Sequence, residues 1–180
     1  MQEQATGNLL SMDESIVFPL MIDLHREGER QGPGGKEQTL LALELSGVDP
    51  KSAIDVADIG CGTGASTLVL ADRLQKAQIT AVDLFPEFLN VLSDNAQTVG
   101  CSDRIAPTEA SMDALPFEDE SLDLIWSEGA IYNMGFSKGV EAWYRFLRPG
   151  GILSVSEITW LYPDPPSDIK QFWEAEYPEI

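Results

Sequence analysis

A crowded glycine segment places the strongest limit on how this chain can fold. The segment 60–65 reads Gly-Cys-Gly-Thr-Gly-Ala, and it joins the apolar run 54–59 to a helical pattern over 65–75. Glycines at such a strand-to-helix junction allow backbone dihedrals that other residues rarely adopt, and they let a ligand approach the bare backbone. We therefore expect a ligand-binding loop at the first crossover of a parallel sheet.

The rest of the chain alternates in the same way. Apolar runs predict strands at 54–59, 79–83, 104–110, 122–126 and 152–156, and helical spacing predicts helices at 11–27, 36–45, 65–75, 86–99 and 137–147. Pro86 suits a first helical turn, and Gly100 suits a helix stop. Strands that alternate with helices of this length predict an α/β fold with a doubly wound, Rossmann-like, mostly parallel sheet and helices on both faces.

Length, charge and cysteine usage exclude several classes of protein. The 180 residues suit one domain. A formal net charge of −19 disfavours a nucleic-acid partner, because such binding depends on Lys and Arg displacing counterions. Cys61 and Cys101 have neither a CxxC pattern nor a nearby histidine, so no metal site is expected and a reducing, cytoplasmic setting is the default. The apolar runs are too short for a membrane span, and the N-terminus does not read as a signal peptide.

The nature of the ligand stays open at this point. Gly60, Gly62 and Ala65 also fit the relaxed dinucleotide fingerprint G-x-G-x-x-G/A. Asp83 ends the second expected strand, where a carboxylate accepts hydrogen bonds from the ribose hydroxyls of either kind of adenosine ligand. These residues alone leave an NAD-dependent oxidoreductase as one interpretation.

Four motifs in register narrow the choice. They are Asp58-Ile-Gly-Cys-Gly-Thr-Gly64, Ser111-Met-Asp-Ala-Leu-Pro-Phe117, Ser121-Leu-Asp-Leu-Ile125 and Leu147-Arg-Pro-Gly-Gly151. In this order, between about residues 54 and 158, they resemble the class I S-adenosylmethionine-dependent methyltransferases of the ubiquinone/menaquinone small-molecule type. The acid two residues before the first glycine and the extra glycine, Gly64, suit that family better than the dinucleotide binders. The resemblance implies S-adenosyl-L-methionine as the cofactor and methyl transfer to an unidentified small-molecule acceptor.

The resemblance also implies the residues that bind the cofactor. They are Asp58, Gly60, Cys61, Gly62, Thr63, Gly64, Asp83, Leu84, Met112, Asp113, Ser127 and Glu128. In the family, the acid at the position of Asp113 contacts the adenine amino group, and the backbone beside it contacts a ring nitrogen. Asp113 as a plain loop acid is the alternative.

The acceptor side is less strongly specified. Glu128 is a candidate general base or a charge that attracts the sulfonium, and the alternative is an acid bonded to the backbone. Tyr132 and Asn133 are candidates for orienting the acceptor, or else they pack and cap. In the family the segment 25–36 is a lid, so His25 is a second candidate base and Gln31 a candidate substrate contact. We assign residues 1–46 to the helical lid segment and 47–180 to the core of a single domain.

The C-terminal region departs from the family pattern. After the fifth expected strand, an aromatic and proline-rich stretch over 160–177 favours core packing and a helical lid over a substrate wall. We expect no strands six and seven of the family pattern, which predicts either a truncated chain or a fifth strand whose edge a partner covers. An uncovered edge predicts self-association into a homo-oligomer. The main interpretation is an active small-molecule methyltransferase, and the alternative is a catalytically incompetent fragment or interaction module that still binds the cofactor.

Overall fold

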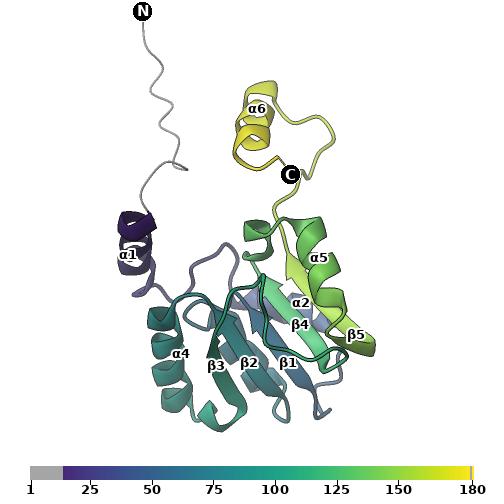
Figure 1. Ribbon diagram of the computed structural model, residues 1–180. Helices are drawn as coiled ribbons and strands as arrows, with labels where there is room; N and C mark the ends of the chain where they lie inside the picture. The colour runs from purple at the N-terminus through teal and green to yellow at the C-terminus, as the bar shows by residue number, and fades with distance from the viewer. Residues whose placement is uncertain (1–13, 179) are drawn as a thin grey trace, which may run out of the picture.

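A computed structural model describes residues 14–178 and 180 of the chain (Figure 1). The helices are α1 (Glu14–His25), α2 (Lys36–Ser46), α3 (Ala65–Arg73), α4 (Pro86–Val99), α5 (Phe136–Tyr144) and α6 (Ser167–Glu176), with short 3-10 turns η2 (Ser102–Arg104) and η3 (Ile131–Asn133). The strands are β1 (Asp55–Ile59), β2 (Gln78–Asp83), β3 (Ile105–Glu109), β4 (Leu122–Glu128) and β5 (Leu147–Ser156).

The strands of the described region form one sheet in the order β3-β2-β1-β4-β5, and every pair is parallel. From β1 the chain moves outward through β2 to β3, and then it returns to the other side of β1 for β4 and β5. The order therefore reverses between β1 and β4. In open α/β sheets, ligands bind at the carboxyl ends of the strands beside such a switch point. The predicted fold class is confirmed.

Two apolar layers cover the two faces of the sheet. One layer packs Leu43 of α2, Leu70 of α3 and Leu92 of α4 against Trp126. The other joins Trp143 of α5 to residues of β1 and β4. Burying each such large side chain contributes about 1.5–3 kcal/mol, which makes these two layers the main support of the sheet.

The predicted bounds differ from the structure at several ends. The helix expected over 11–27 is α1 within the described residues, and its positions 11–13 lie outside them. Strand β4 runs two residues past its predicted end, so Ser127 and Glu128 belong to the sheet. The motif residues 148–151, which precede the strand expected at 152–156, lie inside β5, because Leu147 already pairs with Leu122 before the register shifts. This long-range pairing has no local sequence signal.

The expectation that the aromatic stretch after β5 packs into the core is wrong. Leu161 is 87% exposed, Tyr162 is 76% exposed and Phe172 is 59% exposed. Helix α6 buries none of its residues. Figure 1 shows α1 and α6 projecting beyond the end of the sheet from which η3 and the chain after β5 emerge. Exposed apolar side chains therefore gather near the carboxyl ends of the strands.

Candidate functional site

The loop between β1 and α3 has the conformation that its glycines predict. Gly60 and Gly62 have φ values of +73° and +54°, a region that side chains strain. A Cβ atom at Gly60 would also collide with the side chain of Ala130, and one at Gly62 would collide with the side chain of Gln31. Gly60 therefore needs glycine for conformation and for space, and Gly62 needs it for conformation, since the flexible end of Gln31 can move aside.

Asp83, at the end of β2, is fastened to this loop. Its Oδ2 accepts a hydrogen bond from the backbone N–H of Gly62 at 2.8 Å, and its Oδ1 accepts one from the N–H of Phe85 at 3.0 Å. Burial raises the pKa of Asp83 above its usual value, and these backbone bonds oppose that effect. Each carboxylate oxygen has a second lone pair. The side chain is therefore a rigid acceptor that suits the two hydroxyls of a ribose.

Asp58 lies beneath the loop and is fully buried. Its Oδ2 accepts hydrogen bonds from the hydroxyls of Ser66 at 2.9 Å and Thr67 at 2.6 Å, which join β1 to the first turn of α3. Burial raises the pKa of Asp58 from 3.8 to about 6, with the two hydroxyls acting in the opposite direction. The other oxygen, Oδ1, has no hydrogen-bond partner in the structure. It is a buried acceptor directly under the ligand-binding loop.

Glu128 is held on both carboxylate oxygens. Oε2 accepts bonds from Nη1 of Arg30 at 2.8 Å and from the hydroxyl of Thr39 at 3.1 Å, while Oε1 accepts one from Nε1 of Trp126 at 2.8 Å. The side chains of Arg30 and Glu128 are only 16% and 12% exposed. Accepting a proton would compete with these bonds, so the geometry disfavours Glu128 as a general base. Its partners are side chains, whereas the expected alternative was the backbone.

Sequence reasoning missed Arg30 and Thr39. The sequence signal that could have indicated Arg30 was a cation next to Gln31 in the predicted lid segment, in a chain with only eleven Lys and Arg residues. Its partner could not be found from the pattern, because Arg30 and Glu128 are 98 positions apart.

Gln31 reaches the glycine loop. Its Oε1 accepts a bond from the N–H of Thr63 at 3.1 Å, and its Nε2 lies 2.8 Å from the hydroxyl of Thr63. The same Nε2 is 3.1 Å from the carbonyl oxygens of both His25 and Gly28. We expected Gln31 beside the acceptor. The structure places its carboxamide on the loop that the motif assigns to the cofactor, and a contact between Gln31 and the acceptor stays a prediction.

The remaining predicted residues lie around the same end of the sheet. Ser127 is buried and donates from its hydroxyl to the carbonyl of Ile59 at 2.9 Å. Asp113 is exposed, with its Oδ1 3.0 Å from Nζ of Lys138. The carbonyl of Met112 accepts a bond from Nε1 of Trp143 at 3.1 Å. Leu84 is 51% exposed.

The candidate acceptor residues occupy the exit of β4 and the end of α1. Tyr132 is half exposed, and Asn133 donates from Nδ2 to the carbonyl of Ala130 at 3.0 Å, which is a local capping contact. His25 is half-buried at the end of α1. Its backbone carbonyl oxygen accepts a hydrogen bond from Nε2 of Gln31. Roles for these three residues in binding an acceptor stay predictions.

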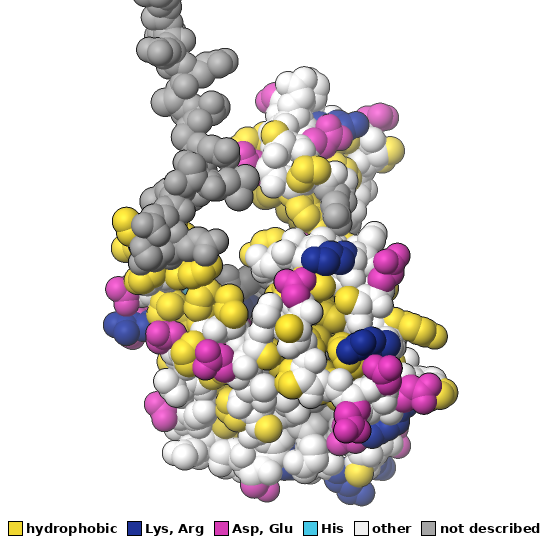
Figure 2. Space-filling model, viewed as in Figure 1, with side chains coloured by type: hydrophobic (Ala, Val, Ile, Leu, Met, Phe, Trp, Pro, Cys, Tyr) yellow, Lys and Arg dark blue, Asp and Glu magenta, His cyan; other side chains and the backbone are white. Residues whose placement is uncertain are grey.

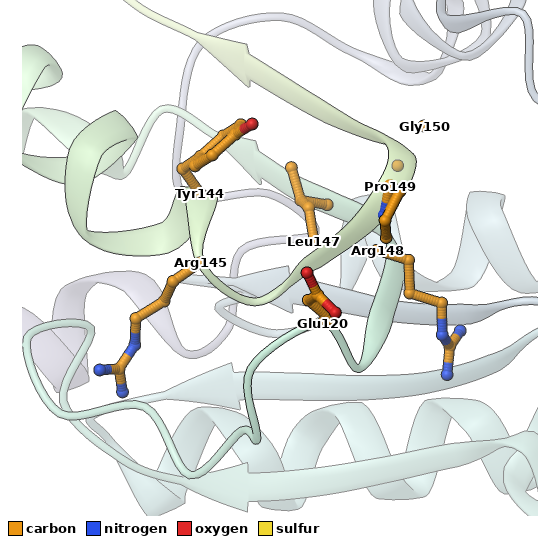
Figure 3. Close-up of a pocket in the computed structure, with 8 residues that line it drawn as sticks. Glu120, Tyr144, Arg145, Leu147, Arg148, Pro149 and Gly150 are labelled. Carbon is orange, nitrogen blue, oxygen red and sulfur yellow. The ribbon is translucent and has the colours of Figure 1, made fainter.

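Two of the four motifs, 121–125 and 147–151, begin at the amino ends of β4 and β5, at the opposite end of the strands from the glycine loop. Arg148 contacts Asp55 through Nη2 at 2.8 Å and Asp123 through Nη1, joining the amino ends of β1, β4 and β5. A hollow of about 290 Å³ lies at this end of the sheet. Figure 3 shows two of the side chains that line it, Arg145 and Arg148, extending to either side of Glu120. These motif residues therefore stabilise the sheet, far along the strands from the glycine loop.

A second hollow, of about 310 Å³, lies between the loop 112–115 and α5. Neither hollow is lined by a residue of the glycine loop. Within residues 14–178 and 180, no group of three His, Cys, Asp or Glu side chains could hold a metal ion, and no helix is long and apolar enough to cross a membrane.

Comparison with known proteins decides the family. A family model described as a methyltransferase domain matches residues 56–151, which run from β1 into β5 and make up more than half of the chain. The chain belongs to the class I S-adenosylmethionine-dependent methyltransferases. This confirms the resemblance inferred from the motifs, and with it the cofactor expected for the family. The oxidoreductase interpretation is no longer supported.

The similar proteins act on different acceptors. The chain is 31% identical to the ubiquinone/menaquinone biosynthesis C-methyltransferase UbiE of Hydrogenovibrio crunogenus, over 87% of this chain and 56% of that protein. It is 33% identical to erythromycin 3''-O-methyltransferase of Saccharopolyspora erythraea, over 58% of this chain and 34% of that protein. The structure of Haemonchus contortus phosphoethanolamine N-methyltransferase 2 with S-adenosyl-L-methionine matches with a TM-score of 0.69 at 24% identity, covering 83% and 35% of the two chains. That match shows the fold.

The methyltransferase chain spans between 34% and 58% of the length of the first curated relatives it matches. Its residues nevertheless fit the family's cofactor. Asp83 offers a ribose acceptor, Gly60 and Gly62 leave the backbone bare, and Asp58 keeps an unpaired acceptor beneath the loop.

Proposed function

We propose that this chain binds S-adenosylmethionine at the carboxyl ends of β1 and β2 and transfers the methyl group to a small-molecule acceptor by in-line displacement. The observation that carries the proposal is the 2.8 Å hydrogen bond from the N–H of Gly62 to Asp83, which joins the end of β2 to the glycine loop. It lies beside the switch point between β1 and β4, where the fold leads us to expect a ligand.

The chain's own residues bind and orient. The cofactor supplies an already activated methyl group when it is bound. Asp83 would hold the ribose, and the backbone of Gly60 and Gly62 would border the cofactor closely. Asp113 and Met112 would contact the adenine, as the family motif implies. Asp58 keeps the shape of the loop through its bonds to α3.

Positioning is the main chemical task of such a site. Alignment of the acceptor atom about 3 Å from the methyl group and exclusion of water supply most of the acceleration. The segment 25–36 covers the glycine loop through Gln31, so it can exclude water there. A general base is needed only where the acceptor must lose a proton. His25 is our candidate for that role, because both oxygens of Glu128 already accept hydrogen bonds.

The surroundings of the site support a small, partly apolar acceptor. Helix α1 exposes Ile16, Phe18, Leu20, Met21 and Leu24, and α6 exposes Ile169, Phe172 and Trp173. Figure 2 shows hydrophobic side chains gathered over α1 and around α6 at this end of the molecule. The net charge of −19 opposes a nucleic-acid acceptor. We place the reaction in the cytoplasm, as the two free, buried cysteines suggest.

Calorimetry with S-adenosylhomocysteine and NAD, side by side, tests the cofactor. We expect binding of S-adenosylhomocysteine alone, and tight NAD binding without it would contradict the proposal. Gly60→Val should abolish binding, since its side chain would strain the backbone and collide with Ala130. Gly47→Val is the matched control, because Gly47 has a similar φ of +71° with nothing within 4 Å of the added atom.

Turnover separates an enzyme from a domain that only binds the cofactor. Purified chain, labelled S-adenosylmethionine and a panel of quinone, macrolide and amine acceptors would be incubated together. We expect label transfer to at least one small molecule. Cofactor binding without transfer to any of them would favour the catalytically incompetent alternative.

A further inference from the structure

Two consecutive residues of the N-terminal segment span the switch point of the sheet. Arg30 bonds Glu128 at the end of β4, and Gln31 bonds Thr63 in the loop after β1. The lid loop, residues 26–35, therefore lies across the boundary between β1 and β4, where the strand order reverses. Any ligand that binds beside this boundary lies next to the lid loop.

We propose that Arg30 is a positioning residue that holds the lid loop closed and so keeps Gln31 on the glycine loop. Arg30 is not among the motif residues and would act through Gln31, without touching the cofactor. The inference rests on the proposed function, because the glycine loop must be the cofactor site. It predicts that Arg30 controls how long the cofactor stays bound.

The anchor for Arg30 is built on two elements. Nη1 lies 2.8 Å from Glu128 of β4, and Nη2 lies 2.9 Å from the hydroxyl of Thr39 of α2. Thr39 is fully buried, and Trp126, which holds the other oxygen of Glu128, is 1% exposed. A guanidinium makes both bonds at once, whereas an ammonium on a flexible stem cannot reproduce that fork.

The low solvent exposure of Arg30 and Glu128 strengthens the attraction between them. With 16% and 12% of the two side chains exposed, salt screens the pair less than it screens a surface pair. Removing Arg30 would also leave the mostly buried carboxylate of Glu128 without its cation. The backbone of Arg30 continues directly into Gln31, so release of the guanidinium frees the carboxamide that bonds Thr63. Opening the lid loop therefore requires that the Arg30–Glu128 pair break first.

The test is the dissociation rate of S-adenosylhomocysteine, measured by stopped-flow chase. Arg30→Met keeps the length of the side chain and removes its charge and its donors. We expect dissociation about tenfold faster or more, as for other losses of one member of an enclosed ion pair. Arg30→Lys should give an intermediate rate, because it keeps the charge and loses the fork. Glu128→Gln should also accelerate dissociation.

A double-mutant comparison separates positioning from mere stability. In a Gln31→Ala background, Arg30→Met should produce little further change, because the route through Gln31 is already lost. The matched control is Arg104→Met, whose half-buried guanidinium bonds the carbonyls of Leu74 and Ala71 away from the lid loop. That variant can lose stability, but its dissociation rate should match the wild type.

The outcomes distinguish this inference from the proposed function. Wild-type protein that fails to bind S-adenosylhomocysteine would remove the proposed function. Normal binding with an unchanged dissociation rate in folded Arg30→Met would overturn the inference alone. Equal acceleration with and without Gln31 would also overturn it. If Arg30→Met does not fold, Arg30→Lys decides, and a wild-type rate in that variant counts against the proposal.

Discussion

The carboxylate of Asp83 accepts the backbone N–H of Gly62 at 2.8 Å, so the acid that ends β2 is fixed to the loop that follows β1. The two elements that the family uses for the cofactor are therefore joined into one unit by the chain's own hydrogen bond. A preorganised acceptor loses little entropy when it binds a ribose.

Asp83→Asn should weaken binding of S-adenosylhomocysteine about 10- to 100-fold, because hydrogen bonds to a charged group contribute about 1.5–3 kcal/mol. Calorimetry at neutral pH measures the effect. Asp94→Asn, on the exposed side of α4, is the control with the same chemical change. Equal affinity in Asp83→Asn and wild type would exclude a ribose role for Asp83.

Asp58 makes stability depend on pH in a defined window. Its pKa rises from 3.8 to about 6 in the folded state, so the folded chain retains a proton that the unfolded chain has lost. The stability contributed by that proton is present below pH 4 and is lost as the pH rises to about 6. The loss is about 3 kcal/mol, at 1.36 kcal/mol per pKa unit.

Urea unfolding of wild type and Asp58→Asn between pH 4 and 7 isolates this contribution. Asparagine does not titrate, so the difference between the two proteins should change in favour of Asp58→Asn as the pH rises. Asp83 titrates in both proteins, so most of its contribution cancels in the difference, the remainder being its electrostatic interaction with Asp58. A difference that stays constant over this range would refute the raised pKa of Asp58.

His25 and Glu128 should have separate effects on catalysis. If His25 is the base, His25→Ala lowers kcat about 10²-fold or more and leaves the affinity for S-adenosylhomocysteine near that of wild type. Glu128→Gln should instead act on cofactor dissociation, because its oxygens hold Arg30, Thr39 and Trp126. The measurement is kcat beside Kd for each variant. An unchanged kcat in His25→Ala would remove His25 from the reaction.

Arg148→Ala should lower the thermal midpoint without changing cofactor binding. Arg148 joins Asp55 and Asp123 at the amino ends of the strands, at the opposite edge from the glycine loop. Effects on distant sites are nearly independent, so the Kd of S-adenosylhomocysteine should stay within about twofold. Differential scanning calorimetry measures the thermal midpoint, and ligand titration measures the Kd. A large loss of affinity at constant stability would assign Arg148 to the cofactor site.

The free edge of β5 predicts self-association of this 180-residue chain. Strand β5 ends the strand order of the described sheet, and such an edge presents unpaired backbone groups. Light scattering over a concentration series should show a mass that rises above the monomer. A constant monomer mass at high concentration would contradict this prediction.

The order of helices and strands could be predicted from residue type and spacing. Helix α4 begins and ends at the predicted residues, because Pro86 suits a first helical turn and Gly100 adopts the left-handed conformation that ends the helix. These choices depend on neighbours along the chain. The order of the motifs likewise carried the resemblance that implied the family and its cofactor. By contrast, α5 ends before its predicted residue, where the pairing of Leu147 with Leu122 takes over.

The contacts that organise the site were decided by the tertiary structure. Residue type marked Glu128 as a candidate base or sulfonium partner, but its bond to Arg30, 98 positions earlier, could not be predicted from local sequence. Gln31 was expected at the acceptor, and its bond to Thr63 was not predicted from the sequence. Two of the motifs stabilise the amino ends of the strands, through the contacts of Arg148 with Asp55 and Asp123. Local sequence determines the backbone of each element, whereas the partner of a polar side chain depends on which loops the assembled sheet brings together. The amino-acid sequence therefore determined the fold and, through the family resemblance, the cofactor class, whereas only the folded chain decided which side chains contact one another around the glycine loop.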